Sequence, residues 1–195
     1  MTSGGEQLYD ATGRRKYVCG SERSRFVDAA DRADRSTRNL GLLLVYSGCR
    51  ISEALGVTPA QLDVETGHVV FRTLKRRRVT FRSVPIPPAL MRELRGQATG
   101  LPTDAPLWSF CRVTAWRRIK RLMAAAGIRG SQATAKGLRH GFGIANAEEN
   151  IPPALTQRWM GHARLETTAI YQHAVGNEER AFAQRIWRRS EKRRH

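Results

Sequence analysis

The sequence predicts a mostly α-helical domain with a small antiparallel β-sheet, an α+β fold. Much of the 195-residue chain has apolar residues at helical spacing, in segments separated by turns that contain glycine or proline. Two short segments rich in β-branched and aromatic residues, 68–74 and 79–87, flank a run of basic residues as the strands of a hairpin would. With 41% hydrophobic residues, the chain can bury a core.

Three helices are predicted before the hairpin. The first follows Ser21, whose hydroxyl can cap it, and runs through ERSRFVDAADRA. The second, STRNLGLLLVYS, is expected to stop at Gly48, and the segment 49–56 reads as a fresh helical turn. The segment 58–67 is rich in turn residues and leads into the first strand.

More helices are predicted after the hairpin, and the first begins with prolines, which a first helical turn tolerates. These helices are 87–96, 112–127, 138–150, 155–161, 165–172 and an amphipathic last helix over 178–195. The segments 98–108 and 128–137 are expected to be connections. Residues 1–16 are expected to form a flexible N-terminal segment, and 17–195 a single domain without repeats.

The charge balance indicates the kind of partner. The chain has 34 Lys and Arg against 17 Asp and Glu, a formal net charge of +17, and such a positive field attracts polyanions, most commonly nucleic acid. An anionic membrane is the rival partner, but there is no apolar run near 18 residues, no lipidation motif and no apolar region of a secretory signal. Three widely spaced cysteines suggest free thiols in a reducing compartment. We therefore expect a cytoplasmic protein that binds nucleic acid and no membrane.

Several common catalytic motifs are missing from the sequence. There is no P-loop, no CxxC pair, no HExxH and no set of carboxylates spaced as metal ligands. The adjacent pairs Glu148-Glu149 and Glu178-Glu179 would point to different faces of a helix. A two-metal nuclease needs clustered carboxylates, so an enzyme of this sequence that cuts nucleic acid would have to neutralise the phosphate with cations instead.

Two arginines lie at the edges of apolar segments. Arg50 falls between Gly48 and the helical turn ISEAL, and Arg139 opens the apolar helix LRHGF. Burying such a charge is costly unless it is paired, and Glu53, three residues after Arg50, offers a purely structural partner. The functional alternative is that both guanidinium groups fork onto the non-bridging oxygens of a phosphate.

Two further basic segments are candidates for contact with DNA, the first with its backbone and the second with a groove or the backbone. Lys75 begins the run at the predicted hairpin tip, and a second run lies in the helix around Trp116. For that helix, a solvated face with Trp116 in the core is an equally good interpretation. The candidate DNA-contact residues are Arg76, Arg77, Arg78, Arg117, Arg118, Lys120 and Arg121.

The segment GHARLETTAIY contains a Gly161-His162 pair nine residues before Tyr171. On its own, such a pair is more often a buried histidine and a packed tyrosine. However, SGCRISEAL resembles the first arginine box of the tyrosine recombinase (phage integrase) family. The segment LRHGFGIANAEENIPPALTQRWMGHARLETTAIYQH resembles the second box almost throughout, and the resemblance covers about residues 15–185.

The resemblance implies the catalytic core of a DNA breaking-rejoining enzyme, and a site-specific recombinase of the integrase, invertase or resolvase type. It implies that Tyr171 attacks a DNA phosphodiester to give a 3′-phosphotyrosyl link and a free 5′-hydroxyl. Arg50, Arg139 and His162 would stabilise charge on the phosphoryl oxygens, and Lys75 would protonate the leaving 5′-oxygen. No metal or cofactor is implied.

The chain departs from the family pattern at two points. The second box usually begins His-x-x-Arg, whereas here Lys136 precedes Arg139; we interpret Lys136 as a tolerated variant, because lysine can also donate to a phosphate. The alternative is a loop lysine in water. With Arg50 so near the start, the N-terminal core-binding domain of most members is expected to be absent, as in the short recombinases that flip fimbrial promoters.

The resemblance also implies partners. These are double-stranded DNA, further copies of the chain in a homo-tetramer on DNA, and, in some systems, accessory proteins. The segment after Tyr171, with the apolar residues Val175, Phe182 and Ile186, would then dock on a neighbouring subunit or pack on its own domain.

Two other functions stay open at this point. One is a non-catalytic, DNA-binding accessory remnant of a recombinase, and the other is a type IB topoisomerase that uses a similar residue set. The GCRISE segment and the nine-residue step from His162 to Tyr171 favour a recombinase over a topoisomerase. Covalent trapping of the protein on DNA separates an enzyme from a remnant.

Overall fold

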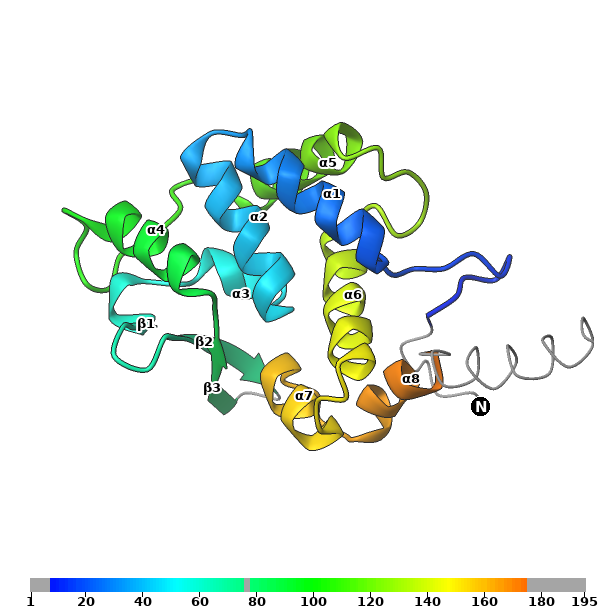
Figure 1. Cartoon of the computed structure of the whole chain (residues 1–195). Coiled ribbons are helices and arrows are strands. Elements are labelled where there is room, and N and C mark those ends of the chain that lie inside the picture. The colour runs from blue at the N-terminus through cyan, green and yellow to red at the C-terminus, as the bar shows by residue number, and fades with distance from the viewer. Residues whose placement is uncertain (1–7, 76–77, 175–195) are drawn as a thin grey trace, which may run out of the picture.

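The computed structural model describes residues 8–75 and 78–174 (Figure 1). These residues form a group of helices with a small antiparallel sheet at one side, which confirms the predicted α+β fold. The helices are α1 (Gly20–Asp31), α2 (Arg35–Ser47), α3 (Ile51–Leu55), α4 (Pro88–Ala98), α5 (Arg112–Ala125), α6 (Ala135–Glu148), α7 (Pro153–Met160) and α8 (Glu166–Ala174). The helix predicted over 178–195, with Phe182 and Ile186, lies outside the described residues, as does Val175.

The sheet has three strands in the order β1-β2-β3, namely β1 (Leu62–Asp63), β2 (His68–Lys75) and β3 (Arg78–Pro85). The predicted hairpin is β2 and β3, paired from His68↔Pro85 to Lys75↔Arg78. The short strand β1 was not predicted, because two residues are too few to show an alternating pattern.

Several helices start one or more residues away from their predicted starts, and capping hydrogen bonds explain two of these differences. The N-cap of α1 is Cys19 and not Ser21, because the Glu22 carboxylate accepts a hydrogen bond from the Cys19 N–H (3.1 Å) as in a capping box. The Thr134 hydroxyl accepts from the Gly137 N–H (2.9 Å), so α6 begins at Ala135, inside the predicted connection. As a result, Lys136 lies in the first turn of a helix.

The predicted end of α2 is confirmed. Gly48 ends the helix with φ 60°, the left-handed conformation that glycine adopts most easily, and its N–H bonds to the Leu44 carbonyl. The turn places Arg50 at the N-cap of α3.

The main core surrounds α2, whose residues Leu40, Leu43 and Leu44 have no exposed surface, and it includes residues of the helices that pack on α2. A second cluster joins Leu8 to α6, α7 and α8. Leu8 belongs to the segment expected to be flexible, and residues 8–16 make defined contacts, with a bridge between Tyr9 and Arg15.

The three cysteines form no disulfide, as expected. No helix among residues 8–75 and 78–174 has the length and apolar character needed to cross a membrane.

Candidate active site

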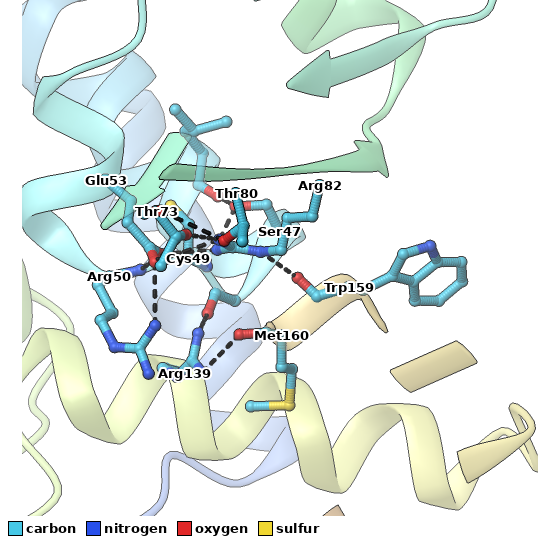
Figure 2. Close-up of polar contacts among 12 residues, drawn as sticks. Ser47, Cys49, Arg50, Glu53, Thr73, Thr80, Arg82, Arg139, Trp159 and Met160 are labelled. Atoms are coloured by element: carbon cyan, nitrogen blue, oxygen red, sulfur yellow. Dashed lines mark hydrogen bonds and ion pairs between the residues drawn. The ribbon is translucent and has the colours of Figure 1, made fainter. Parts of the chain in front are cut away.

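Glu53 of α3 is the centre of a buried polar network (Figure 2). Its carboxylate accepts hydrogen bonds from the Arg50 backbone N–H (2.8 Å), the Arg50 guanidinium (2.9 Å), the Arg82 guanidinium (2.6 and 3.1 Å) and the Thr73 hydroxyl (2.9 Å). Burial acts to raise the pKa of Glu53, but the hydrogen bonds and charge of Arg82, followed by those of Arg50, outweigh it and hold that pKa at about 2. Glu53 is therefore ionised, and it orients both arginines.

Arg82 was missed by the sequence analysis. Its side chain is only 6% exposed, and it lies over the Phe71 ring at 5.0 Å. It also donates to the Thr73 hydroxyl (2.7 Å) and to the Trp159 carbonyl (2.8 Å), so it joins the sheet to α3 and α7. The sequence did offer one signal of its burial. Residues alternate between the two faces of a strand, so Arg82 shares a face of β3 with the apolar, buried Val84.

Arg139 of α6 is 4% exposed and joins two segments that lie far apart in the sequence (Figure 2). Its Nη1 donates to the Gly48 carbonyl (2.7 Å) and its Nη2 to the Met160 carbonyl (2.6 Å). Gly48 precedes Arg50, and Met160 precedes the Gly161-His162 pair. Arg139 therefore brings the two arginine boxes into one site.

The two predicted arginines differ in exposure. Arg50 pairs with Glu53, as its structural interpretation expected, yet 45% of its side chain is exposed. A phosphate could therefore reach Arg50 without disturbing the core, whereas Arg139 is held by buried carbonyl groups.

His162 follows Gly161, which ends α7 in the left-handed conformation. The His162 side chain is buried, and its Nδ1 lies 2.9 Å from the Thr168 hydroxyl. Burial, together with the positive charges of Arg139 and Arg50, lowers the pKa of His162 to about 3. The imidazole is therefore neutral at pH 7, with one N–H to donate.

Tyr171 of α8 lies inside the protein and is 1% exposed. Its Oη lies 3.1 Å from His140 Nδ1, and its ring stacks on His162 with centroids 6.1 Å apart. Gly143 of α6 leaves the space for this ring: a Cβ atom there would lie 2.5–2.7 Å from three Tyr171 ring atoms, closer than real Cβ contacts.

His140 is a second residue that the sequence analysis missed. Burial, and then the charges of Lys136 and Arg139, lower the pKa of His140 to about 4, so this imidazole is also neutral at pH 7. The available signal was its place directly after Arg139 in an apolar segment. The Tyr171 phenol thus lies between two neutral histidines.

The two candidate lysines lie at the ends of their elements. Lys136 is exposed in the first turn of α6, one helical turn before His140, so it is not the loop lysine of the alternative interpretation, although it is in water. Lys75 ends β2 opposite Arg78. The side chains of Lys75 and Arg78, and all of Arg76 and Arg77, lie outside the described part of the structure.

The basic side chains of α5 fall into two groups. Arg118 donates to Asp34 (3.2 Å) and Thr37 (2.7 Å), and Lys120 donates to the Ala133 carbonyl (3.0 Å), so both are held within the protein. Arg117 and Arg121 are exposed. The interpretation that placed Trp116 in the core is wrong, because Trp116 is 51% exposed on this helix.

Among the residues described, no group of three or more His, Cys, Asp or Glu side chains could hold a metal ion.

The chain is similar to known proteins over most of its length. The model of the phage integrase family matches residues 16–178. The chain is 26% identical over 180 residues to tyrosine recombinase XerA of Pyrococcus furiosus, covering 87% of this chain and 61% of the relative. It is 33% identical over 141 residues to tyrosine recombinase XerD of Pseudomonas aeruginosa, covering 67% of this chain and 47% of the relative.

Solved structures show the same architecture. A crystal structure of XerA recombinase matches with TM-score 0.69 at 25% identity, covering 80% of this chain and 60% of that one. The XerH site-specific recombinase in a post-cleavage complex with its palindromic difH substrate matches with TM-score 0.78 at 20% identity, covering 96% of this chain and 58% of that one. The chain therefore spans about half to three-fifths of the length of these relatives.

Proposed function

Because the chain belongs to the phage integrase family, whose model matches residues 16–178, we propose that it is a tyrosine-type site-specific DNA recombinase. In this proposal it cuts and rejoins double-stranded DNA through a 3′-phosphotyrosyl intermediate. The observation that carries the proposal is the convergence of Arg50, Arg139, His162 and Tyr171, from four separate segments, on one partly buried site.

The proposed reaction needs no external energy source. Tyr171 Oη attacks the phosphorus, an Oη–P bond forms and the bond from phosphorus to the 5′-oxygen breaks. The proton of the phenol passes to water, and we assign to Lys75 the role of general acid that gives a proton to the leaving 5′-oxygen. The same steps in reverse reseal a strand, because the covalent link conserves the energy of the broken bond.

The cations supply what the phenol lacks. A phenol of ordinary pKa, about 10, is a poor nucleophile at neutral pH, so charge that develops on the phosphoryl oxygens must be stabilised by donors already in place. Arg50 is accessible to a phosphate because its side chain is 45% exposed, and Arg139 is held in place by its hydrogen bond to the Met160 carbonyl. The neutral His162 ring retains an N–H to donate. Lys136, exposed beside this site on α6, is proposed as a further donor.

Tyr171 must also move before it can react. With 1% exposure and its Oη against His140, it cannot touch a phosphodiester outside the protein. The proposed reaction therefore begins with the Tyr171 side chain leaving the space beside Gly143.

The proposed partners follow from charge and from the relatives. The net charge of +17 and the exposed Arg117 and Arg121 favour contact with the phosphate backbone, which would hold the DNA regardless of its sequence. A solved structure of XerH is a complex with its difH substrate, and by that analogy the chain would act on duplex DNA. The family resemblance, and not that structure, is the reason to propose a homo-tetramer on DNA in the cytoplasm. The topoisomerase alternative is not favoured, because the curated relatives are named tyrosine recombinases.

Covalent trapping tests the proposal and its non-catalytic alternative. We expect the wild-type protein to form a protease-sensitive adduct with some members of a randomised library of nicked duplexes, and Tyr171→Phe to form none. Tyr9→Phe, at an exposed tyrosine outside the site, is the matched control and should keep the full yield. An adduct that persists in Tyr171→Phe contradicts the assignment of the nucleophile, and no adduct from the wild type on any duplex supports a DNA-binding remnant.

A further inference from the structure

Thr168 has no role in the sequence-based picture, and the structure places it beside His162. It lies on α8, three residues before Tyr171, and is 2% exposed. Its Oγ1 lies 2.9 Å from His162 Nδ1, a contact between two buried side chains.

The chemistry of the two groups sets the direction of this hydrogen bond. A neutral imidazole carries one hydrogen, on either Nδ1 or Nε2, and a hydroxyl has one hydrogen to donate. Within the described residues, the contact with His162 Nδ1 is the only hydrogen bond of the Thr168 hydroxyl. A buried hydroxyl that donates to nothing loses the free energy of a hydrogen bond, so Thr168 donates to Nδ1.

The position of the ring hydrogen follows from that direction. When Nδ1 accepts a hydrogen bond it must present its lone pair, and the hydrogen of the ring is then on Nε2. In the opposite tautomer, Nε2 would carry a lone pair, which repels the oxygen of a phosphate.

We propose that Thr168 is a positioning residue that fixes His162 in the Nε2–H tautomer, and so makes it a hydrogen-bond donor to a phosphoryl oxygen. The donation to a phosphoryl oxygen rests on the proposed recombinase function, whereas the tautomer of His162 does not depend on DNA.

The location of Thr168 couples the tautomer to the nucleophile. Thr168 and Tyr171 lie about one turn apart on α8, and both contact the His162 ring, one through Nδ1 and the other by stacking. Docking of α8 therefore packs Tyr171 in its buried position and sets the protonated nitrogen of His162 in a single event.

Nuclear magnetic resonance tests the tautomer directly. Protein with isotope-labelled histidine would give two-bond proton–nitrogen spectra, in which the signals of His162 are assigned by their loss in His162→Ala. We expect the Nε2–H pattern in wild type, the same pattern in Thr168→Ser, which keeps a hydroxyl, and a shift towards the Nδ1–H pattern in Thr168→Val. Thr167→Val, at the neighbouring half-buried threonine, is the matched control and should leave the pattern unchanged.

Cleavage gives the second readout. Thr168→Val should slow adduct formation on a nicked duplex by about 10- to 100-fold, by analogy with the loss of partners that orient metal-binding histidines. Thr168→Ser should restore most of the rate, and the affinity for duplex DNA should be unchanged. In a His162→Ala background, Thr168→Val should change the rate by less than about twofold, because Thr168 acts through the ring.

The outcomes separate this inference from the proposed function. The inference is overturned if His162 in Thr168→Val keeps the wild-type tautomer, or if Thr168→Val is equally harmful with and without His162. If Thr168→Val does not fold, Thr168→Ala and Thr168→Ser carry the same comparison. If the tautomer shifts as expected but the wild type forms no adduct, the positioning role stands and the recombinase proposal fails.

Discussion

Glu53 and Arg82 form a two-point ion pair inside the protein, with Nη2 2.6 Å from Oε2 and Nη1 3.1 Å from Oε1. Both side chains are 6% exposed, and the pair links α3 to the sheet. Because the same carboxylate binds the half-exposed Arg50, the buried pair positions the arginine that is available to a phosphate.

Removing Arg82 alone should therefore destabilise the protein strongly. We expect Arg82→Met to lower the free energy of unfolding by about 3–5 kcal/mol, because it leaves the Glu53 carboxylate buried without its main partner. Urea unfolding measures the loss. The double variant Arg82→Met with Glu53→Gln should recover part of it, and strictly additive losses would show that the two residues do not interact.

Arg50 and Arg139 should respond differently to truncation. Arg50→Ala should slow covalent adduct formation by on the order of a hundredfold or more, through loss of a preorganised donor. Its free energy of unfolding should fall by no more than about 1 kcal/mol, because the Arg50 side chain is 45% exposed.

Arg139→Ala should lose both activity and stability, since it leaves the buried carbonyl groups of Gly48 and Met160 without their donor. Adduct formation, urea unfolding and DNA affinity are measured on both variants. If Arg50→Ala weakens DNA binding as much as it slows cleavage, Arg50 is only a backbone contact.

Stability should fall in mild acid because of the two buried histidines. The folded-state pKa values of His162 (about 3) and His140 (about 4) lie below the ordinary value near 6.5. Below pH 6.5 the unfolded chain therefore binds protons that the folded protein excludes, and the free energy of unfolding falls by up to about 1.4 kcal/mol per pH unit for each histidine. Above pH 6.5 this contribution is complete and constant.

Chemical unfolding at several pH values between 4.5 and 7.5 measures this slope. His140→Gln should reduce this slope, because it removes one of the two buried histidines. A flat stability profile in the wild type would contradict the burial of neutral histidines in this site.

Lys136 should affect cleavage more than DNA binding if it donates to the phosphate. Lys136→Ala should then slow adduct formation well beyond any loss of affinity, and Lys136→His should restore much of the rate, because imidazole can also donate. Activity of the His variant should vary with pH around 6.5, where histidine titrates. Arg129→Ala removes one exposed charge elsewhere and controls for net charge; a wild-type rate in Lys136→Ala would withdraw Lys136 from the site.

DNA binding should weaken steeply with salt, and the exposed arginines of α5 should contribute to that slope. Removing one cation that binds a phosphate lowers the log–log salt slope by about 0.9, so Arg117→Ala and Arg121→Ala should each reduce it by about that amount. Arg92→Ala, an exposed arginine on α4, is the control. If Arg117→Ala and Arg92→Ala have equal effects, α5 is not a specific DNA contact.

Local patterns in the sequence predicted the elements well, and long-range pairing accounts for what they missed. Gly48 marked the end of α2, and β-branched residues marked β2 and β3, because these signals lie within a few residues of the structure that they specify. The role of Arg82 depends on Glu53, 29 residues earlier, and on the Trp159 carbonyl, 77 residues later. No local pattern encodes such a partner.

The candidate site divides in the same way. Arg50, Arg139, His162 and Tyr171 could be selected because two ordered motifs contain them, although their roles stay predictions. The apolar segment after Arg139 could mark His140 as buried, but its contact with Tyr171 and that of Thr168 with His162 arise only when α6 and α8 pack together. The start of α6 was misplaced because Thr134, a capping residue, lies in a segment that reads as a connection.

Because Gly143 has no side chain, it leaves room for the Tyr171 ring, and this determines which mutations can reveal its role. An alanine scan normally removes atoms and reports what those atoms contributed, but at Gly143 the same substitution adds a methyl group in the space of the Tyr171 ring. A single added carbon atom at position 143 would thus prevent the Tyr171 ring from occupying its buried position. For protein engineers, Gly143 is the position at which the resting place of a reactive side chain can be adjusted by size alone, without changing any charge or hydrogen-bonding group.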